Sequence, residues 1–90
     1  MQHHVYVLRC SNGSLYTGYT VDLQRRLKQH NLGLASKYTR SRRPVVLAYY
    51  ETLKTRSLAL KREIEIKKLP RSKKIALISK SDATTDRTLE

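Results

Sequence analysis

The sequence predicts an α+β fold in which a small three-stranded antiparallel sheet is flanked by helices, in the order β-β-α-β-α-α. Three observations support this: a turn signal joins two strand-like segments, a third apolar run follows later, and amphipathic segments lie between and after them. Ninety residues fit one domain, because a chain this short cannot bury two cores. We expect the domain to span residues 1–80 and the polar tail, residues 81–90, to be disordered.

The first two strands are expected at residues 3–10 and 15–20. Both segments are rich in β-branched and aromatic residues, and the Ser-Asn-Gly-Ser sequence between them is a strong turn signal. They should pair as an antiparallel hairpin. Gly18 lies inside the second strand, where a missing side chain indicates a bulge or a close approach to the backbone.

The first helix is expected at residues 23–31. Asp22 can cap it by accepting hydrogen bonds from free backbone N–H groups. Leu23 and Leu27 are four residues apart and share one face, and Arg26 and His30 lie beside them with the same spacing. The pattern therefore places a cation and an imidazole at the rim of the core.

Residues 32–44 lack periodicity and should form an exposed basic loop. The next segment, residues 45–51, is almost entirely apolar, which is typical of a strand buried on both faces at the centre of a sheet. Thr55 or Ser57 can cap a second helix that ends at about Lys68. Pro70 is suited to the first position of a third helix, ending near residue 79 and docked by Ile75, Leu77 and Ile78.

The composition indicates a polyanionic partner. With 19 Lys and Arg against 7 Asp and Glu, the net charge of +12 attracts nucleic acid, although a ribosome or membrane surface would attract the same charge. The chain has no apolar run long enough to span a bilayer and no secretory signal, so we expect a cytoplasmic protein without a membrane partner. Its single cysteine excludes an internal disulfide.

Five chemically useful residues occur in a regular order. Tyr6 and Tyr16 are ten residues apart on the paired strands, Arg26 follows after ten more, and His30 and a later helical carboxylate come next. In this order the sequence resembles the GIY-YIG nuclease superfamily. The resemblance rests on the segments His4-Val5-Tyr6, Tyr16-Thr17-Gly18, residues 26–31, residues 33–39 and Ala59-Leu60-Lys61-Arg62-Glu63.

The resemblance covers roughly residues 4–79. It is greatest to the small stand-alone bacterial branch and to the catalytic domain of structure-specific nucleases that act on branched DNA. One departure is His4, which replaces the glycine of the first triplet and could crowd a position that is usually bare.

The resemblance implies phosphodiester hydrolysis with divided roles. One of Tyr6 and Tyr16 would activate water and the other would orient or donate to the phosphate, but the sequence does not say which. His30 would assist proton transfer. Arg26 offers a planar, permanently charged group that can hold two phosphate oxygens.

The metal ligand implied by the resemblance is Glu63, which would hold one Mg²⁺ or Mn²⁺ through a single carboxylate. Glu65 is the rival, because helical periodicity places the apolar face between the two glutamates. The Ala-Leu-x-x-Glu pattern of the superfamily selects Glu63. Without a metal, Glu63 would instead pair with Lys67 one turn later. Zinc is disfavoured, because the adjacent strand residues His3 and His4 point to opposite faces.

The predicted function is that of a DNA endonuclease using one divalent metal ion on branched, flapped or single-stranded DNA, with a targeting protein as a further partner. An alternative is a nucleic-acid-binding module of this fold with weak or no activity, to which His4 is the hint. A third hypothesis is a basic ribosome- or RNA-associated protein with an accidental motif. The residues expected to contact nucleic acid are Lys28, Lys37, Tyr38, Arg40, Arg42 and Arg43.

Overall fold

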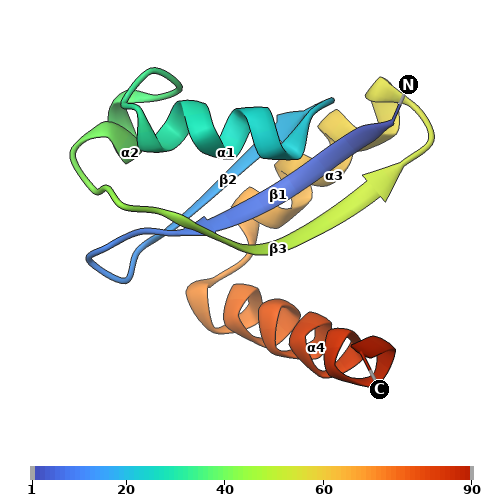
Figure 1. Ribbon diagram of the computed structural model, residues 1–90. Coiled ribbons are helices and arrows are strands. Elements are labelled where there is room, and N and C mark those ends of the chain that lie inside the picture. The colour runs from blue at the N-terminus through green and yellow to red at the C-terminus, as the bar shows by residue number, and fades with distance from the viewer. Residues whose placement is uncertain (1, 90) are drawn as a thin grey trace.

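The computed structural model describes the backbone of residues 2–89 and the side chains of residues 2–80. It is an α+β fold built on a three-stranded antiparallel sheet, as predicted. In Figure 1, α1 lies above the sheet and α4 below it. The elements in order are β1 (His3–Arg9), β2 (Leu15–Thr20), α1 (Leu23–Asn31), α2 (Lys37–Arg40), β3 (Val46–Leu53), α3 (Arg56–Lys68) and α4 (Arg71–Leu89).

The central strand is β1, because the sheet order is β2-β1-β3. The prediction that the third strand would be central and buried on both faces is wrong: β3 is an edge strand, and Val46 and Tyr50 are 56% and 51% exposed. The hairpin uses one edge of β1, which leaves the other edge for β3. An apolar run records hydrophobicity but not hydrogen-bonding neighbours, and the buried run is in β1.

Alternation along β1 divides the core between the two sheet faces. Val5 and Val7 pack with Ala59 and Ile66 of α3 and with Ile78 of α4. On the opposite face, Tyr6 and Leu8 form a second cluster, against which Tyr16 of β2 and Leu23 and Leu27 of α1 are packed. Because successive strand residues point to opposite faces, the helix carrying Arg26 and His30 covers the Tyr6 face.

Side-chain caps begin the helices at the expected places. The Asp22 carboxylate accepts from the backbone N–H of Arg25 at 3.1 Å and begins α1. The Thr55 hydroxyl accepts from the N–H of Leu58 at 3.1 Å, so Thr55, and not Ser57, caps α3.

The segment of residues 32–44 is not the wholly exposed loop that was predicted. It contains the short helix α2, in which the Ser36 hydroxyl accepts from the N–H of Thr39 at 3.1 Å. Thr39 is fully buried and anchors this turn to the domain. Four residues are too few for a visible hydrophobic period, so the pattern could not reveal the helix.

A partly buried ion pair attaches α3 to the edge strand. The Arg62 guanidinium donates two hydrogen bonds to Glu51, each of 2.9 Å, and the Tyr49 hydroxyl also donates to Glu51. Burial alone would raise the pKa of Glu51, but the hydrogen bonds from Arg62 and Tyr49 outweigh it and hold that pKa below its usual value. Burial, followed by the contact with Glu51, raises the pKa of Tyr49 to about 12.

Pro70 immediately precedes α4, and Ile78 and Leu77 dock the helix while Ile75 is 40% exposed. The backbone of α4 continues to Leu89, well past the end expected near residue 79. The side chains of residues 81–90 lie outside the described residues, and the disordered tail stays a prediction. No helix in the described part of the chain is long and apolar enough to cross a bilayer.

Candidate active site

Tyr6 lies directly over Gly18, its pairing partner on β2. A Cβ atom at position 18 would lie 2.5 Å from the Tyr6 hydroxyl oxygen and 2.6 Å from its Cζ atom. The close approach expected at Gly18 is therefore confirmed, and the group that approaches is the tyrosine ring. Tyr6 is only 2% exposed, so this contact places its hydroxyl in a confined space beneath α1.

His30 links Tyr6 to α2 through two buried hydrogen bonds. Its Nε2 atom lies 2.9 Å from the Tyr6 hydroxyl and its Nδ1 atom 2.7 Å from the hydroxyl of Thr39. His30 is fully buried and not at the rim of the core, because the turn containing Thr39 covers its outer edge. Burial, together with the nearby charge of Arg26, lowers the pKa of His30 to about 4, so the ring is neutral at pH 7.

Tyr16 reaches the same cluster from β2. Its ring centroid is 5.1 Å from that of His30 and 6.5 Å from that of Tyr6. Tyr38 of α2 stacks on its outer side at 5.8 Å, and the Arg42 guanidinium carbon lies 3.9 Å from the centre of the Tyr38 ring. The aromatic rings therefore form a continuous path from the buried histidine to the basic segment.

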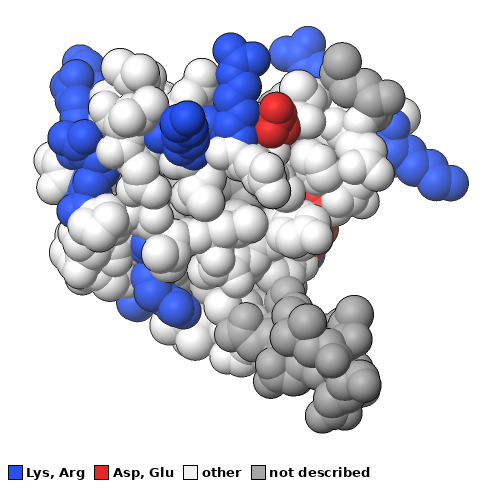
Figure 2. Space-filling view, in the orientation of Figure 1, with Lys and Arg blue, Asp and Glu red and all other residues white. Residues whose placement is uncertain are grey.

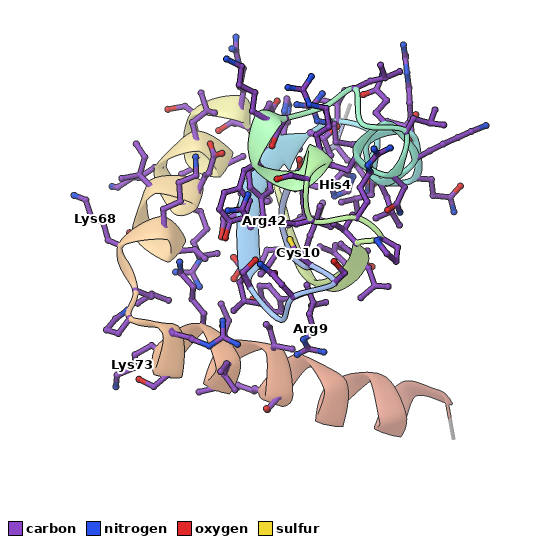
Figure 3. The ribbon with its side chains drawn as sticks, turned by 90° about the vertical axis from the view of Figure 1, so that its left-hand side faces the viewer. His4, Arg9, Cys10, Arg42, Lys68 and Lys73 are labelled. Carbon is purple, nitrogen blue, oxygen red and sulfur yellow. The ribbon has the colours of Figure 1, made fainter. Side chains whose placement is uncertain are left out.

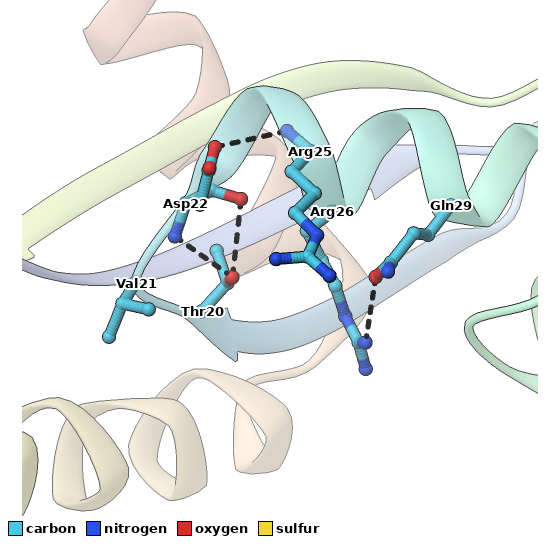
Figure 4. Close-up of a pocket in the computed structure, with 6 residues that line it drawn as sticks. All are labelled: Thr20, Val21, Asp22, Arg25, Arg26 and Gln29. Atoms are coloured by element: carbon cyan, nitrogen blue, oxygen red, sulfur yellow. Dashed lines mark hydrogen bonds between the residues drawn. The ribbon is translucent and has the colours of Figure 1, made fainter.

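Arg26 approaches the Tyr6 hydroxyl from α1. One terminal guanidinium nitrogen donates to Gln29 at 3.3 Å, whereas the Nε atom is buried and has no hydrogen-bond partner among the described residues. Burial raises the pKa of Tyr6, and the hydrogen bond and charge of Arg26 only partly oppose that rise. An open pocket of about 230 Å³ lies beside Arg26 (Figure 4) and is lined by Thr20, Val21, Asp22, Arg25, Arg26 and Gln29.

Glu63 is the carboxylate that the structure brings toward Tyr6. Its side chain is 17% exposed, and its negative charge contributes to the raised pKa of Tyr6. Its carboxylate also pairs with Lys67 at 3.2 Å, the expected contact one helical turn later. Glu65 is 54% exposed and pairs with Arg62 at 3.4 Å. Burial and electrostatics thus separate two glutamates that periodicity could not.

Basic side chains gather over α1 and α2 (Figure 2). Two residues that follow α2 are held in place: Arg42 donates to the carbonyl of Tyr38 at 2.8 Å, and Arg43 donates to that of Arg40 at 2.8 Å. Figure 3 labels Arg42 near the middle of the domain, above the hairpin that contains Cys10. The predicted set comes from α1 (Lys28), from α2 (Lys37, Tyr38 and Arg40) and from the segment after it (Arg42 and Arg43).

His3 and His4 make separate contacts on opposite faces of β1. The Nδ1 atom of His3 lies 2.8 Å from the Tyr19 hydroxyl, and that of His4 lies 2.9 Å from the Thr52 hydroxyl. His4 is 8% exposed, so the sheet accommodates the imidazole at the position of the superfamily's glycine. Within residues 2–80, no group of three or more His, Cys, Asp and Glu side chains could hold a metal ion.

Thr39 and Ser36 are the site residues that sequence reasoning missed. Thr39 contacts His30 directly, and Ser36 caps the turn that presents it. Their only signal was the small-residue and threonine segment within the superfamily resemblance, since a lone threonine in a basic loop has no periodicity that indicates burial.

The neutral state of His30 predicts acid-sensitive folding. In the unfolded chain the imidazole gains a proton below about pH 6.5, whereas in the fold it stays neutral until about pH 4. The free energy of unfolding should therefore decrease as the pH falls from 6.5 to 4, by on the order of 3 kcal/mol from this group. Denaturant unfolding of the wild type and His30→Gln across this range tests it. If the free energy of unfolding changes equally with pH in the wild type and in His30→Gln, the lowered pKa is not a property of His30.

Comparisons with known proteins agree with this geometry. Residues 2–76 match the model of the GIY-YIG catalytic domain. A UPF0213 protein of Staphylococcus saprophyticus is 53% identical over 78 residues, covering 87% of this chain and 95% of the relative. A UPF0213 protein of Staphylococcus aureus is 55% identical over 76 residues, covering 84% and 93%.

Two solved structures are also similar. The NMR structure of a UPF0213 protein from Bacillus halodurans has a TM-score of 0.57 and 46% identity, covering 88% of this chain and 84% of that one. The NMR structure of the protein EF2693 from E. faecalis has a TM-score of 0.56 and 40% identity, covering 100% and 90%. The chain therefore belongs to the GIY-YIG family, in its UPF0213 group.

Proposed function

We propose that this protein is a DNA endonuclease that hydrolyses phosphodiester bonds with one divalent metal ion. The observation that carries the proposal is the buried Nε–H of Arg26, which has no partner among the described residues and belongs to a guanidinium beside the Tyr6 hydroxyl. A buried donor without a partner is costly, and a phosphate oxygen would satisfy it. Membership of a family defined by its catalytic domain supports the same conclusion.

The side chains have complementary roles in this reaction. Arg26 holds the phosphate and stabilises the negative charge that grows on its oxygens in the transition state. One of Tyr6 and Tyr16 activates the attacking water and the other orients the phosphate. His30, neutral at pH 7, can accept or pass on a proton at Nε2, where it meets the Tyr6 hydroxyl.

Glu63 fits the metal that the family implies. A single, largely buried carboxylate near the reacting groups suits Mg²⁺ or Mn²⁺, since Mg²⁺ keeps most of its shell as water and phosphate oxygens. When bound, the ion would polarise the phosphate and stabilise the departing oxygen. Lys67 would have to release the carboxylate, which costs little because the Lys67 side chain is 54% exposed and an ion pair open to solvent on one side is weak.

The basic residues on α1 and α2 would hold the DNA backbone. Together with the net charge of +12, they support a polyanionic substrate whose binding weakens with salt. We propose branched, flapped or single-stranded DNA as the substrates to examine, and a targeting protein as a further partner.

Cleavage with a metal series tests the proposal. The purified protein should nick at least one of flapped, branched or single-stranded DNA with Mg²⁺ or Mn²⁺ and none with EDTA. Glu63→Gln, which removes the charge at constant size, should lower kcat by about 100-fold or more, as expected for loss of a metal that stabilises several kcal/mol of charge.

Glu65→Gln is the matched control, because it removes the same charge two residues along the same helix and should keep wild-type activity. If the wild type and Glu63→Gln cleave DNA at equal rates, the cleavage comes from a contaminating nuclease. No cutting of any substrate by the wild type would refute the proposed activity.

A binding module without turnover is the second candidate, and the raised pKa of Tyr6 favours it. Burial keeps this phenol protonated at neutral pH, which opposes a role as a base. Both candidates predict salt-sensitive DNA binding. Binding without metal-dependent cutting in the experiment above would select this one.

A further inference from the structure

Thr39 is a buried polar residue to which the proposed reaction gives no role. Its side chain is fully buried although it belongs to a short helix in a basic segment, and its hydroxyl lies 2.7 Å from Nδ1 of His30. A buried hydroxyl at this distance constrains the ring beside it. The question is which proton arrangement it imposes.

The contacts run from Tyr6 through His30 to Thr39, and the groups at the two ends of this series set the direction of each hydrogen bond. The Arg26 guanidinium lies near the Tyr6 hydroxyl and can only donate, so it cannot accept the hydroxyl proton. That proton is therefore directed to Nε2 of His30, 2.9 Å away. At the other end, the Thr39 hydroxyl can donate to the Ser36 carbonyl, which can only accept, at 3.4 Å, or to the Ser36 hydroxyl at 3.3 Å. The Thr39 oxygen is then free to accept from Nδ1–H.

A neutral imidazole carries one proton, so its two nitrogens must play opposite roles. With Nδ1 donating to Thr39, Nε2 accepts from Tyr6, and each polar group between Arg26 and Ser36 has a partner. The reverse arrangement would place Nε2–H against the Tyr6 oxygen and would leave the Tyr6 hydroxyl proton without that acceptor, and the nearby Arg26 has none to offer. The direction of the Thr39 hydroxyl therefore determines the direction of the Tyr6 hydroxyl.

We propose that Thr39 is a positioning residue, which holds His30 as the Nδ1–H tautomer and thereby aims the Tyr6 hydroxyl. The same residue belongs to α2, whose neighbours Lys37 and Arg40 are on the proposed DNA-binding segment. Thr39 thus connects the turn that would meet the DNA backbone to the reacting tyrosine. The role of Thr39 in catalysis rests on the proposed nuclease function, whereas the predicted His30 tautomer does not depend on that function.

NMR of the histidine ring nitrogens tests the arrangement without substrate. In the wild type at pH 7, His30 should show a protonated Nδ1 and a bare Nε2, and Thr39→Ser should preserve this pattern. Thr39→Val keeps the volume but removes the hydroxyl, and should produce a tautomer mixture or the Nε2–H form. Thr39→Ala is a second variant without the hydroxyl, in case the valine variant does not fold.

Thr17→Val is the matched control. Thr17 is also a buried threonine, 5% exposed, but its hydroxyl has no partner among the described residues. Removing that hydroxyl should leave the His30 tautomer unchanged. An Nε2–H form in the wild type, or an unchanged tautomer in both Thr39→Val and Thr39→Ala, would overturn the inference.

Kinetics separate this inference from the proposed function. With a substrate that the wild type cleaves, Thr39→Val should lower kcat by about 10- to 100-fold, the usual range for loss of a residue that orients a functional histidine. KM should stay the same and Thr39→Ser should restore kcat. An active wild type with an unchanged Thr39→Val would refute only the role of Thr39, whereas an inactive wild type with the expected tautomer would refute only the nuclease proposal.

Discussion

Replacement of Arg26 by alanine should lower kcat for DNA cleavage by about 10³-fold, in the range found when a charged group that stabilises a phosphoryl transition state is removed. Arg26→Lys should recover only part of this loss, because an ammonium keeps the charge but not the planar pair of donors. Single-turnover cleavage with saturating protein measures the effect.

The control for Arg26 must remove the same charge elsewhere. Arg56 is exposed at the start of α3, and Arg56→Ala lowers the net charge equally. It should reduce DNA affinity slightly and leave kcat unchanged. If Arg26→Ala and Arg56→Ala cleave at the same rate, Arg26 contributes only to the general positive field and the proposed site is wrong.

Replacement of Gly18 by alanine should disable the site from the opposite strand. The new Cβ would lie within 3 Å of both the hydroxyl and the ring carbon of Tyr6, so the ring must move and the hydrogen bond to His30 must lengthen or break. We expect a loss of about 1–3 kcal/mol in the free energy of unfolding, as for other overpacked cores. Cleavage should fall together with the Tyr6–His30 contact.

A double-mutant cycle isolates the clash. In a Tyr6→Leu background there is no ring above position 18, so Gly18→Ala should cost much less stability than it does in the wild type. Denaturant unfolding of the four proteins gives the coupling energy. Additive effects within about 0.5 kcal/mol would mean that the two residues do not interact as described.

Local sequence patterns predicted most of the secondary structure. Asp22 and Thr55 cap helices because an oxygen just before a helix satisfies free N–H groups, and this chemistry is visible in the sequence. The hairpin of β1 and β2 likewise follows from its turn residues. By contrast, the edge position of β3 depends on which strands pair, and α2 is too short for a period, so neither could be predicted locally.

In the candidate site, too, some features could be predicted from the sequence and others required the tertiary structure. The order of Tyr6, Tyr16, Arg26 and His30 along the chain indicated that they belong together, and the structure brings their side chains into one cluster. The superfamily pattern favoured Glu63 over Glu65, and the structure adds what helical periodicity left undecided: the Glu63 side chain is 17% exposed and that of Glu65 is 54% exposed.

By itself, the sequence determined most of the strand and helix segments, the positive charge and the set of candidate site residues, because these depend on residue type and spacing. Only the tertiary structure decided that His30 is buried and neutral, that Gly18 must remain bare beneath Tyr6, and that Thr39 contacts His30. Those properties arise from contacts between segments distant in the chain. The physical reason is that burial and hydrogen-bond direction depend on neighbours that no local pattern encodes.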